Sequence, residues 1–207
     1  MQLDRLCDSI IGTRKQAPHD RSCLVGVSGI DASGKGYVAS QLEKQLEDAG
    51  ERVARINVDG WLNLPHVRFW ESNAGEHFYH HALRLDEMFE QLILPLKYNR
   101  GVDLTMEFAE ETAVNFRPHT YRFENVDIIL LEGIFLFKRE YVHHYDSKIW
   151  IECSFETALQ RAIARRQENL SEADTIATYE TIYFPAERHH LKLDDPVAAA
   201  DVIYPNE

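Results

Sequence analysis

The amino-acid sequence predicts an α/β fold of three layers, with a mainly parallel central sheet and helices on both of its faces. Short apolar runs alternate along the chain with segments in which apolar residues recur at helical spacing. A glycine-rich loop joins the first apolar run, residues 23–27, to the first helical segment after it, residues 37–49. The later run 128–131 is apolar throughout, as is typical of strands that are covered on both faces.

Four elements are expected in the first part of the chain. Residues 1–14 alternate charged and apolar side chains and predict a helix, and the run 23–27 predicts a buried strand. The helix over 37–49 ends at Gly50, and residues 52–58 form a second strand. A strand, a glycine loop and a helix in this order point a helix N-terminus toward an anion.

In the middle of the chain, a loop over 60–74 precedes a helix that we expect to end at Pro95, because proline lacks the N–H group that continues a helix. Residues 102–108 and the region 121–123 predict a small hairpin. The last elements are strands over 128–131, 148–153 and 202–204 and a helix over 155–166. Such alternation implies right-handed crossovers and a ligand site outside the carboxyl ends of the strands.

The composition suits one compact domain over residues 1–207, because 44% of the residues are hydrophobic. The formal net charge of −12 works against DNA or RNA as a partner, since a phosphate backbone would be repelled. Cys7, Cys23 and Cys153 show no metal-ligand spacing and predict reduced thiols in a cytoplasmic protein. No apolar run approaches the roughly 20 residues that span a bilayer, and residues 1–14 are unlike a signal peptide, so no membrane contact is expected.

Residues 29–35 have the spacing of a phosphate-binding loop, in which Gly29 and Gly34 stand five apart and Lys35 follows directly. Glycine allows close backbone approach, so successive amide groups can converge on a polyphosphate while Lys35 reaches its β and γ oxygens. The alternative is a glycine-rich turn that binds no ligand. We expect the nucleotide to be bound by Gly29, Asp31, Ala32, Ser33, Gly34, Lys35, Gly36 and Tyr37.

Two acids are expected at the same sheet edge as this loop, Asp59 after the second strand and Glu132 after the run 128–131. Phosphoryl transfer needs a lysine and Mg²⁺ at the phosphates and an acid that orients or deprotonates the attacking hydroxyl. We therefore predict Lys35 and Asp59 as catalytic residues, and Glu132 and Asp59 as metal ligands. The alternatives are a turn residue for Asp59 and a capping acid for Glu132. Gly36 stands where a serine or threonine normally supplies a hydroxyl to Mg²⁺, so the metal site lacks one ligand.

Three arginines, Arg161, Arg165 and Arg166, lie on the expected helix 155–166. They predict a cationic face that closes over the phosphates, with Arg165 acting in catalysis and the other two in nucleotide binding. A solvated helix face is the alternative. Surface or packing roles are favoured over zinc binding for the histidine pairs, which lack a third ligand at a metal-like spacing: His80/His81, His143/His144 and His189/His190.

In this order along the chain, the motifs resemble those of the uridine kinase and phosphoribulokinase family of P-loop kinases. The resemblance rests on the loop 29–35, the stretch 59–61, the run 130–135, the arginine-bearing helix and the closing residues 200–205. It implies the P-loop NTPase fold, ATP and Mg²⁺ as cofactors, a catalytic base at Asp59 and a metal ligand at Glu132. The stretch 59–62 also resembles bacterial pantothenate kinases, which use a different acceptor.

Two departures from the family pattern leave the acceptor open. Uridine kinases carry an aspartate after a phenylalanine in the acceptor helix to hold the ribose hydroxyls, whereas Tyr79 follows Phe78 here. They also place further arginines in the lid, where residues 168–174 carry acids that would repel phosphate.

We predict a kinase that transfers the γ-phosphoryl group of ATP to a hydroxyl of a nucleoside or similar small metabolite. Its acceptor-site region covers about 60–123 and its lid-like region about 161–184. The alternatives are a catalytically weak nucleotide-binding sensor or regulator derived from such a kinase, a pantothenate kinase-like enzyme, and a hydrolase in which Asp59 positions water. The acceptor, the preference for ATP or GTP, and the oligomeric state do not follow from the sequence.

Overall fold

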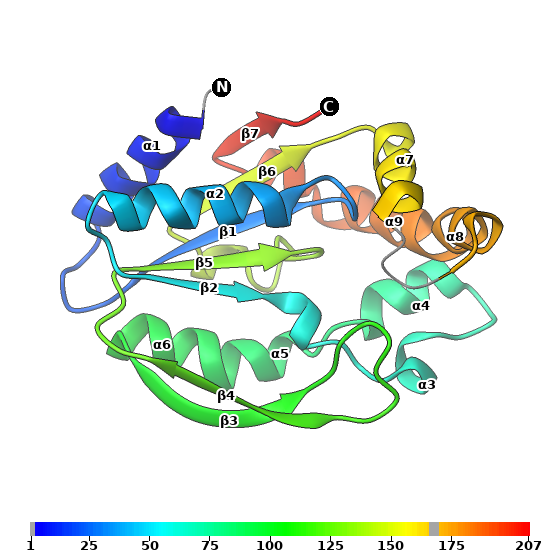
Figure 1. Ribbon diagram of the computed structural model, residues 1–207, viewed down its shortest axis with the longest axis horizontal. Coiled ribbons are helices and arrows are strands. Elements are labelled where there is room, and N and C mark those ends of the chain that lie inside the picture. Colours follow the sequence, from blue (N-terminus) through cyan, green and yellow to red (C-terminus); the bar gives the residue numbers. More distant parts are fainter. Residues whose placement is uncertain (1–2, 166–169) are drawn as a thin grey trace.

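A five-stranded sheet runs through the middle of the computed structural model, which describes residues 3–165 and 170–207 (Figure 1). The strand order is β2-β5-β1-β6-β7, and every neighbouring pair is parallel. The strands are β1 (Cys23–Gly29), β2 (Val53–Asn57), β5 (Ile128–Gly133), β6 (Ser147–Glu152) and β7 (Val202–Pro205). The predicted α/β fold with a parallel central sheet is confirmed.

Helices cover both faces of this sheet (Figure 1). The side chains of Ile128 and Leu130 on β5 pack in one apolar cluster with α1 (Leu3–Gln16) and α2 (Lys35–Asp48). The alternate residues Ile129 and Leu131 pack in a second cluster on the opposite face. That cluster includes residues of α5 (Leu85–Met88) and α6 (Leu94–Asn99). The continuous apolar run of β5 therefore reflects burial on both faces.

The helix that was expected to end at Pro95 is built differently. It is interrupted between α4 (Ala74–His81) and α5, and it then continues through the proline to the end of α6. A π-helical turn, η2 (Phe89–Ile93), lies directly before α6, and the wider turn relieves the clash of the proline ring with the preceding carbonyl. The prediction that Pro95 ends the helix is therefore wrong.

A second long helical segment, for which the sequence predicted no elements, also has a π-helical turn directly before a proline. The π-helical turn η4 (Tyr179–Tyr183) joins α8 (Glu172–Thr178) to α9 (Phe184–Asp194), and Pro185 is the second residue of α9. Together with α4 and α7 (Phe155–Arg165), this segment lies near the carboxyl ends of the strands (Figure 1). Among the described residues, no helix combines the length and apolarity needed to cross a membrane.

The predicted hairpin is confirmed, and its second strand begins earlier than expected. Strands β3 (Val102–Phe108) and β4 (Arg117–Phe123) form a separate antiparallel pair below the main sheet in Figure 1. The remaining short elements are η1 (Val58–Gly60), α3 (Pro65–Arg68), η3 (Val142–His144) and α10 (Pro196–Ala199).

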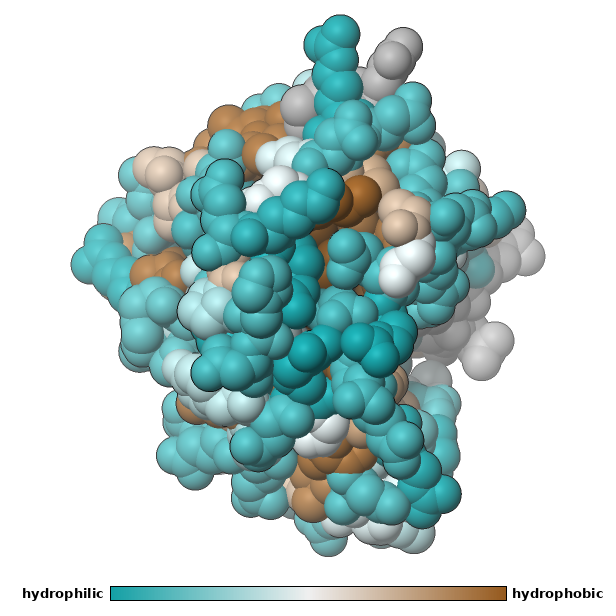
Figure 2. All heavy atoms as spheres, turned by 90° about the vertical axis from the view of Figure 1, so that its left-hand side faces the viewer, coloured by the Kyte–Doolittle hydropathy of each residue, from teal (hydrophilic) through white to brown (hydrophobic). Residues whose placement is uncertain are grey.

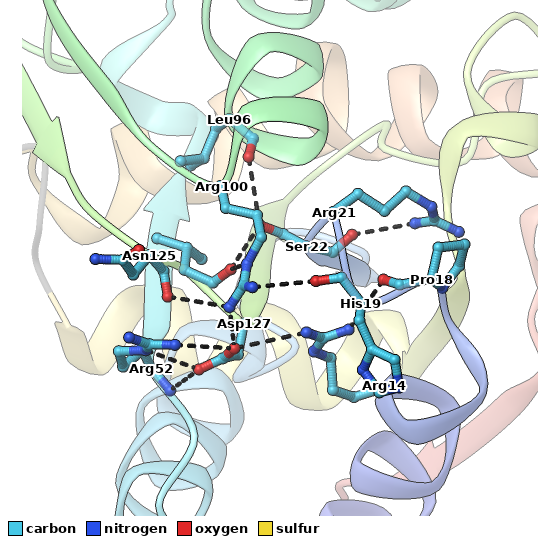
Figure 3. Close-up of polar contacts among 11 residues, drawn as sticks. Arg14, Pro18, His19, Arg21, Ser22, Arg52, Leu96, Arg100, Asn125 and Asp127 are labelled. Atoms are coloured by element: carbon cyan, nitrogen blue, oxygen red, sulfur yellow. Dashed lines mark hydrogen bonds and ion pairs between the residues drawn. The ribbon is translucent and has the colours of Figure 1, made fainter.

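Next to the amino ends of β2 and β5, three arginines form ion pairs with Asp127 (Figure 3). Its carboxylate lies 3.0 Å from Arg52 Nε and 3.6 Å from a guanidinium nitrogen of Arg14, and Arg100 also donates to it. Burial alone would raise the pKa of Asp127, but these hydrogen bonds and charges lower it overall. The face that holds these strand ends is mainly hydrophilic, and its apolar atoms form small separate patches (Figure 2).

We predict that Asp127→Ala lowers the free energy of unfolding by about 2–4 kcal/mol at pH 7, because it leaves partly buried arginines without their carboxylate. The pKa of Asp127 in the folded protein lies below its ordinary value of 3.8. The difference in the free energy of unfolding between wild type and variant should therefore be largest at neutral pH, and it should shrink as the pH falls through the pKa of Asp127 in the folded protein. Urea unfolding at several pH values measures this difference.

The matched control is Asp103→Ala, which removes an ion pair to Arg122 whose side chains are 62% and 69% exposed. This exposed pair should contribute about 0.5 kcal/mol or less. Equal losses in the two variants would contradict a structural role for the Asp127 cluster.

Candidate active site

The phosphate-binding loop turns directly from β1 into α2. Two residues with positive φ, Ala32 (56°) and Gly34 (88°), reverse the chain, and α2 begins at Lys35, two residues earlier than expected. No side chain caps the start of α2, so its first amide groups are available to an anion. At Gly29 a Cβ atom would lie 2.7 Å from the Ile151 carbonyl oxygen, which explains the need for glycine there.

Lys35 is buried within this loop and is held by oxygen atoms. Its Nζ lies 3.4 Å from the Ile30 carbonyl oxygen and 3.8 Å from Asp31 Oδ1. Arg165 lies 3.8 Å from Asp31 Oδ2, and the Tyr179 hydroxyl donates a hydrogen bond to the same oxygen. Burial would raise the pKa of Asp31, but Lys35, Arg165 and the Tyr179 hydrogen bond lower it overall, so this carboxylate stays ionised.

A cavity of about 370 Å³ lies in front of the loop. Most of the residues that the sequence singled out for nucleotide and metal binding line it. Its lining residues are Asp31, Ala32, Gly34, Lys35, Gly36, Tyr37, Asn57, Asp59, Glu111, Glu132, Arg161 and Arg165. Gly29 and Ser33 do not line this cavity, and Arg166 lies outside the described residues. The roles assigned to these residues stay predictions.

Asp59 is fixed at the end of β2 by its neighbour Asn57, whose side-chain oxygen accepts a hydrogen bond of 2.7 Å from the Asp59 amide. Burial raises the pKa of Asp59, Lys35 opposes this rise, and Asp31 adds to it. A raised pKa brings a carboxylate nearer to the working pH of a general base.

Glu132 is the second-last residue of β5, and only 3% of its surface is exposed. Its Oε1 lies 3.5 Å from a guanidinium nitrogen of Arg55, and burial raises its pKa although Lys35 and Arg55 oppose the rise. A Cβ atom at Gly36 would stand 3.5 Å from both Glu132 carboxylate oxygens. Position 36 therefore faces Glu132, and Glu132 and Asp59 could hold Mg²⁺ together with phosphate oxygens.

Arg161 has a structural role that the sequence did not predict, because it links the phosphate loop to residues after β7. One of its guanidinium nitrogens donates to the Ser33 carbonyl oxygen at 3.2 Å and to the Asn206 carbonyl oxygen at 2.9 Å. The Asn206 side chain donates to the same Ser33 oxygen at 2.7 Å. The phosphate loop is thus tied to the end of the chain, beyond β7.

The sequence analysis missed Glu187, which lies on α9 and is 1% exposed. Its Oε1 accepts a hydrogen bond of 3.2 Å from the Asp31 amide. A signal was present in the sequence, because Tyr179, Tyr183 and Ala186 recur at helical spacing and put Glu187 on the same buried stripe. A charged residue on such a stripe indicates a specific partner.

Two further cavities lie beside this phosphate-loop cavity, and Asp59 lines both of them. A cleft of about 460 Å³ lies between the end of β2 and the hairpin. Its hairpin wall includes the rings of Phe108, His119 and Tyr121. A smaller cavity of about 40 Å³ is lined by charged residues, among them Asp59 and Glu187, and by apolar side chains.

Histidines from two different pairs meet between α4 and α9. One donor atom each from Glu76, His80 and His189 lie within 4.8 Å of one another. The sequence showed no third ligand because these residues are far apart in the chain. Glu76 and His80 are exposed, so this cluster lies at the surface.

Comparisons with known proteins agree with this geometry. No protein-family model matches the chain. The uridine kinase of Lactococcus lactis subsp. cremoris is 28% identical over 190 residues, which cover 89% of this chain and 88% of that protein. The uridine kinase of Macrococcus caseolyticus is 28% identical over 191 residues, with the same coverage. A solved structure of a possible uridine kinase from Bacillus stearothermophilus superposes with a TM-score of 0.77 at 22% identity, covering 98% of this chain and 96% of that one.

The fold, the loop and the similarity to proteins named uridine kinase over most of the chain support a P-loop kinase, the class of phosphotransferase with an alcohol group as acceptor. Within that class it is uridine kinase-like, as its sequence resemblance predicted. The comparisons do not favour the sensor or the pantothenate kinase-like alternative.

We predict that Gly36→Thr tightens apparent Mg²⁺ affinity in the nucleotide complex, because the added hydroxyl faces Glu132 and supplies a further oxygen ligand. Gly36→Ala is the matched control, since it adds the Cβ atom without the hydroxyl and should raise helix stability by up to about 1 kcal/mol. Titration of Mg²⁺ against nucleotide turnover compares the three proteins. Equal Mg²⁺ affinities in well-folded Thr and Ala variants would place the metal elsewhere.

We also predict that Lys35→Ala weakens catalysis by on the order of 3 kcal/mol, comparable to the loss of one preorganised electrostatic donor. The fold should survive, as circular dichroism can verify. Lys44→Ala, on an exposed position of α2, should leave turnover unchanged. Full turnover in the Lys35 variant would remove this lysine from the phosphate site.

Proposed function

We propose that the chain transfers the γ-phosphoryl group of ATP to a hydroxyl group of a nucleoside or similar uncharged metabolite. One observation carries this proposal: Asp59 lines the phosphate-loop cavity and both cavities beside it. A hydroxyl group that reaches Asp59 from either side cavity would face the phosphates bound at the loop. Proximity of this kind is the main requirement of phosphoryl transfer.

Each charged group at the phosphate loop then has a role in the proposed phosphoryl transfer. The loop amides and Lys35 hold the phosphates, and Arg165 offsets negative charge that develops during transfer. Asp59 accepts the proton of the attacking hydroxyl. Glu132 and Asp59 hold Mg²⁺, which when bound neutralises phosphate charge. Arg161 and Arg166 are proposed as further nucleotide-binding residues of the lid-like region.

The acceptor-site region supports an uncharged acceptor. Acids, including Asp59 and Glu111, outnumber the arginines Arg55 and Arg68 in the lining of the two side cavities, so a carboxylate or phosphate group would be repelled. The ring-lined wall of the larger cleft suits a flat, partly apolar group such as a nucleoside base. Tyr79, which differs from the uridine kinase pattern, does not line either cavity; its hydroxyl donates to Asp194 at 2.5 Å.

An acceptor panel tests the proposal. Purified protein with MgATP should release ADP slowly alone and much faster with a neutral nucleoside, whereas pantothenate, glycerate and sugar phosphates should be poor acceptors. ADP release that no acceptor stimulates would indicate a hydrolase. Stimulation by anionic acceptors alone would contradict the assignment of an uncharged acceptor.

We predict that Asp59→Asn cuts acceptor phosphorylation by roughly 10²- to 10⁴-fold with little change in ATP affinity. Because a protonated Asp59 cannot accept the proton of the attacking hydroxyl, the wild-type rate should decline at acid pH, and the residual rate of the variant should lack this decline. Asp8→Asn, exposed on α1, is the control. Loss of ATP binding with an unchanged rate per bound ATP would assign Asp59 to the nucleotide or metal site alone.

A further inference from the structure

Glu187 is a buried carboxyl group that no step of the proposed reaction uses. One carboxylate oxygen, Oε1, accepts the hydrogen bond from the Asp31 amide at 3.2 Å. The other oxygen, Oε2, has no hydrogen-bond partner among the residues that the structure describes. A buried polar atom without a partner is costly to the fold, and in a native protein it calls for a specific explanation such as a ligand.

The small cavity that Glu187 lines could hold part of such a ligand. It has a volume of about 40 Å³ and also reaches Asp59 and Asp31. Its apolar walls are Leu62, Phe78, Ile134, Phe135 and Tyr183. A space of this size holds one hydroxyl group or one water molecule, not a whole metabolite. The rest of an acceptor would extend into the larger cleft that also opens at Asp59.

Helix α9 holds Glu187 rigidly at this position. Asp194, near the end of α9, accepts a hydrogen bond of 2.5 Å from the Tyr79 hydroxyl of α4 and pairs with His190 at 2.7 Å. At Gly75 of α4 a Cβ atom would lie 2.4 Å from Pro185 Cβ, so the two helices are in close contact. A side chain supported in this way can orient a ligand accurately.

The carboxyl group can act as a hydrogen-bond donor near neutral pH. Burial raises the pKa of Glu187 to about 8, Asp31 adds to the rise, and Lys35 and the Asp31 amide oppose it. Other charged groups around the cavity are Asp59, Glu111 and Arg68. At pH 7 Glu187 is therefore mostly neutral, and its O–H group can donate to an oxygen atom of a ligand.

We propose that Glu187 is an acceptor-binding residue: its carboxyl group binds a second oxygen atom of the acceptor while Asp59 faces the hydroxyl that is phosphorylated. This inference rests on the proposed kinase function and narrows its substrate class. The acceptor then carries a second oxygen atom besides the hydroxyl that is phosphorylated, and a simple alcohol with one oxygen should be a poor substrate. Because Glu187 also holds the Asp31 amide, it fixes the acceptor relative to the phosphate loop.

Two substitutions separate acceptor binding from a purely structural role as an anchor of the loop. Glu187→Gln keeps an oxygen for the Asp31 amide and an N–H donor for the acceptor, whereas Glu187→Met keeps the size and removes both. Glu180→Gln and Glu180→Met, at an exposed position of η4, are the matched controls. Uridine is the first acceptor probe, followed by the panel acceptor with the highest turnover.

At pH 7 the Gln variant should stay within about threefold of wild type, and the Met variant should raise KM for the acceptor by about tenfold or more. The Kd for ATP, measured without acceptor, should change by less than about threefold in both variants. In wild type, kcat/KM for the acceptor should fall above about pH 8 as the carboxyl group ionises, and the Gln variant should lack this fall.

Three outcomes would overturn the inference. An unchanged acceptor KM in a folded Met variant would remove Glu187 from the acceptor site. An equal weakening of ATP and acceptor binding, or an alkaline fall that persists in the Gln variant, would leave Glu187 as a loop anchor. In each of these cases the wild type still phosphorylates the acceptor, so the proposed function stands. A wild type that no acceptor stimulates would instead overturn the proposed function, and this inference with it.

Discussion

The ammonium group of Lys35 is the charge on which the rest of this site depends. Asp31, Asp59, Glu132 and Glu187 all lie near enough for Lys35 to lower their pKa values. Burial raises the pKa of each of these acids, so without the lysine all four would be harder to ionise. On the proposed function the lysine has two roles: it would attract the phosphates, and it makes the surrounding acids easier to ionise.

The pairing of the parallel strands places the phosphate loop, Asp59 and Glu132 at the same edge of the sheet. Glu132 on β5 pairs with Asn57 on β2 on one side and with Val27 on β1 on the other. Asp59 follows β2 by two residues and the phosphate loop follows β1, so both groups lie beside Glu132 at the same sheet edge. Helix α9 then closes the arrangement from outside the sheet through the contact of Glu187 with the Asp31 amide.

Features that depend on neighbours in the chain could be predicted from the sequence. The phosphate loop is set by glycine spacing, and Asp59 and Glu132 are set by the strands that they end. Features that depend on distant contacts could not be predicted. Pro95 stays within a helix because a π-turn precedes it, and Glu187 faces a loop 156 residues away in the chain. Likewise Arg161 was expected to bind phosphates, and its bonds to the Ser33 and Asn206 carbonyl oxygens could not be read from a helical pattern.

Strand β5 shows how the same chemical group serves stability at one end of the sheet and function at the other. Asp127 precedes this strand and receives several arginine donors, which lower its pKa. Glu132 lies near the carboxyl end of the strand, is more deeply buried, and has a raised pKa, with Arg55 as its ion-pair partner at 3.5 Å. Asp127 is therefore paired with several donors of the folded chain, whereas Glu132 has one arginine partner and, on the proposed function, would also hold a cation. Carboxyl groups left short of donors in this way mark the edge of a sheet where ligands bind.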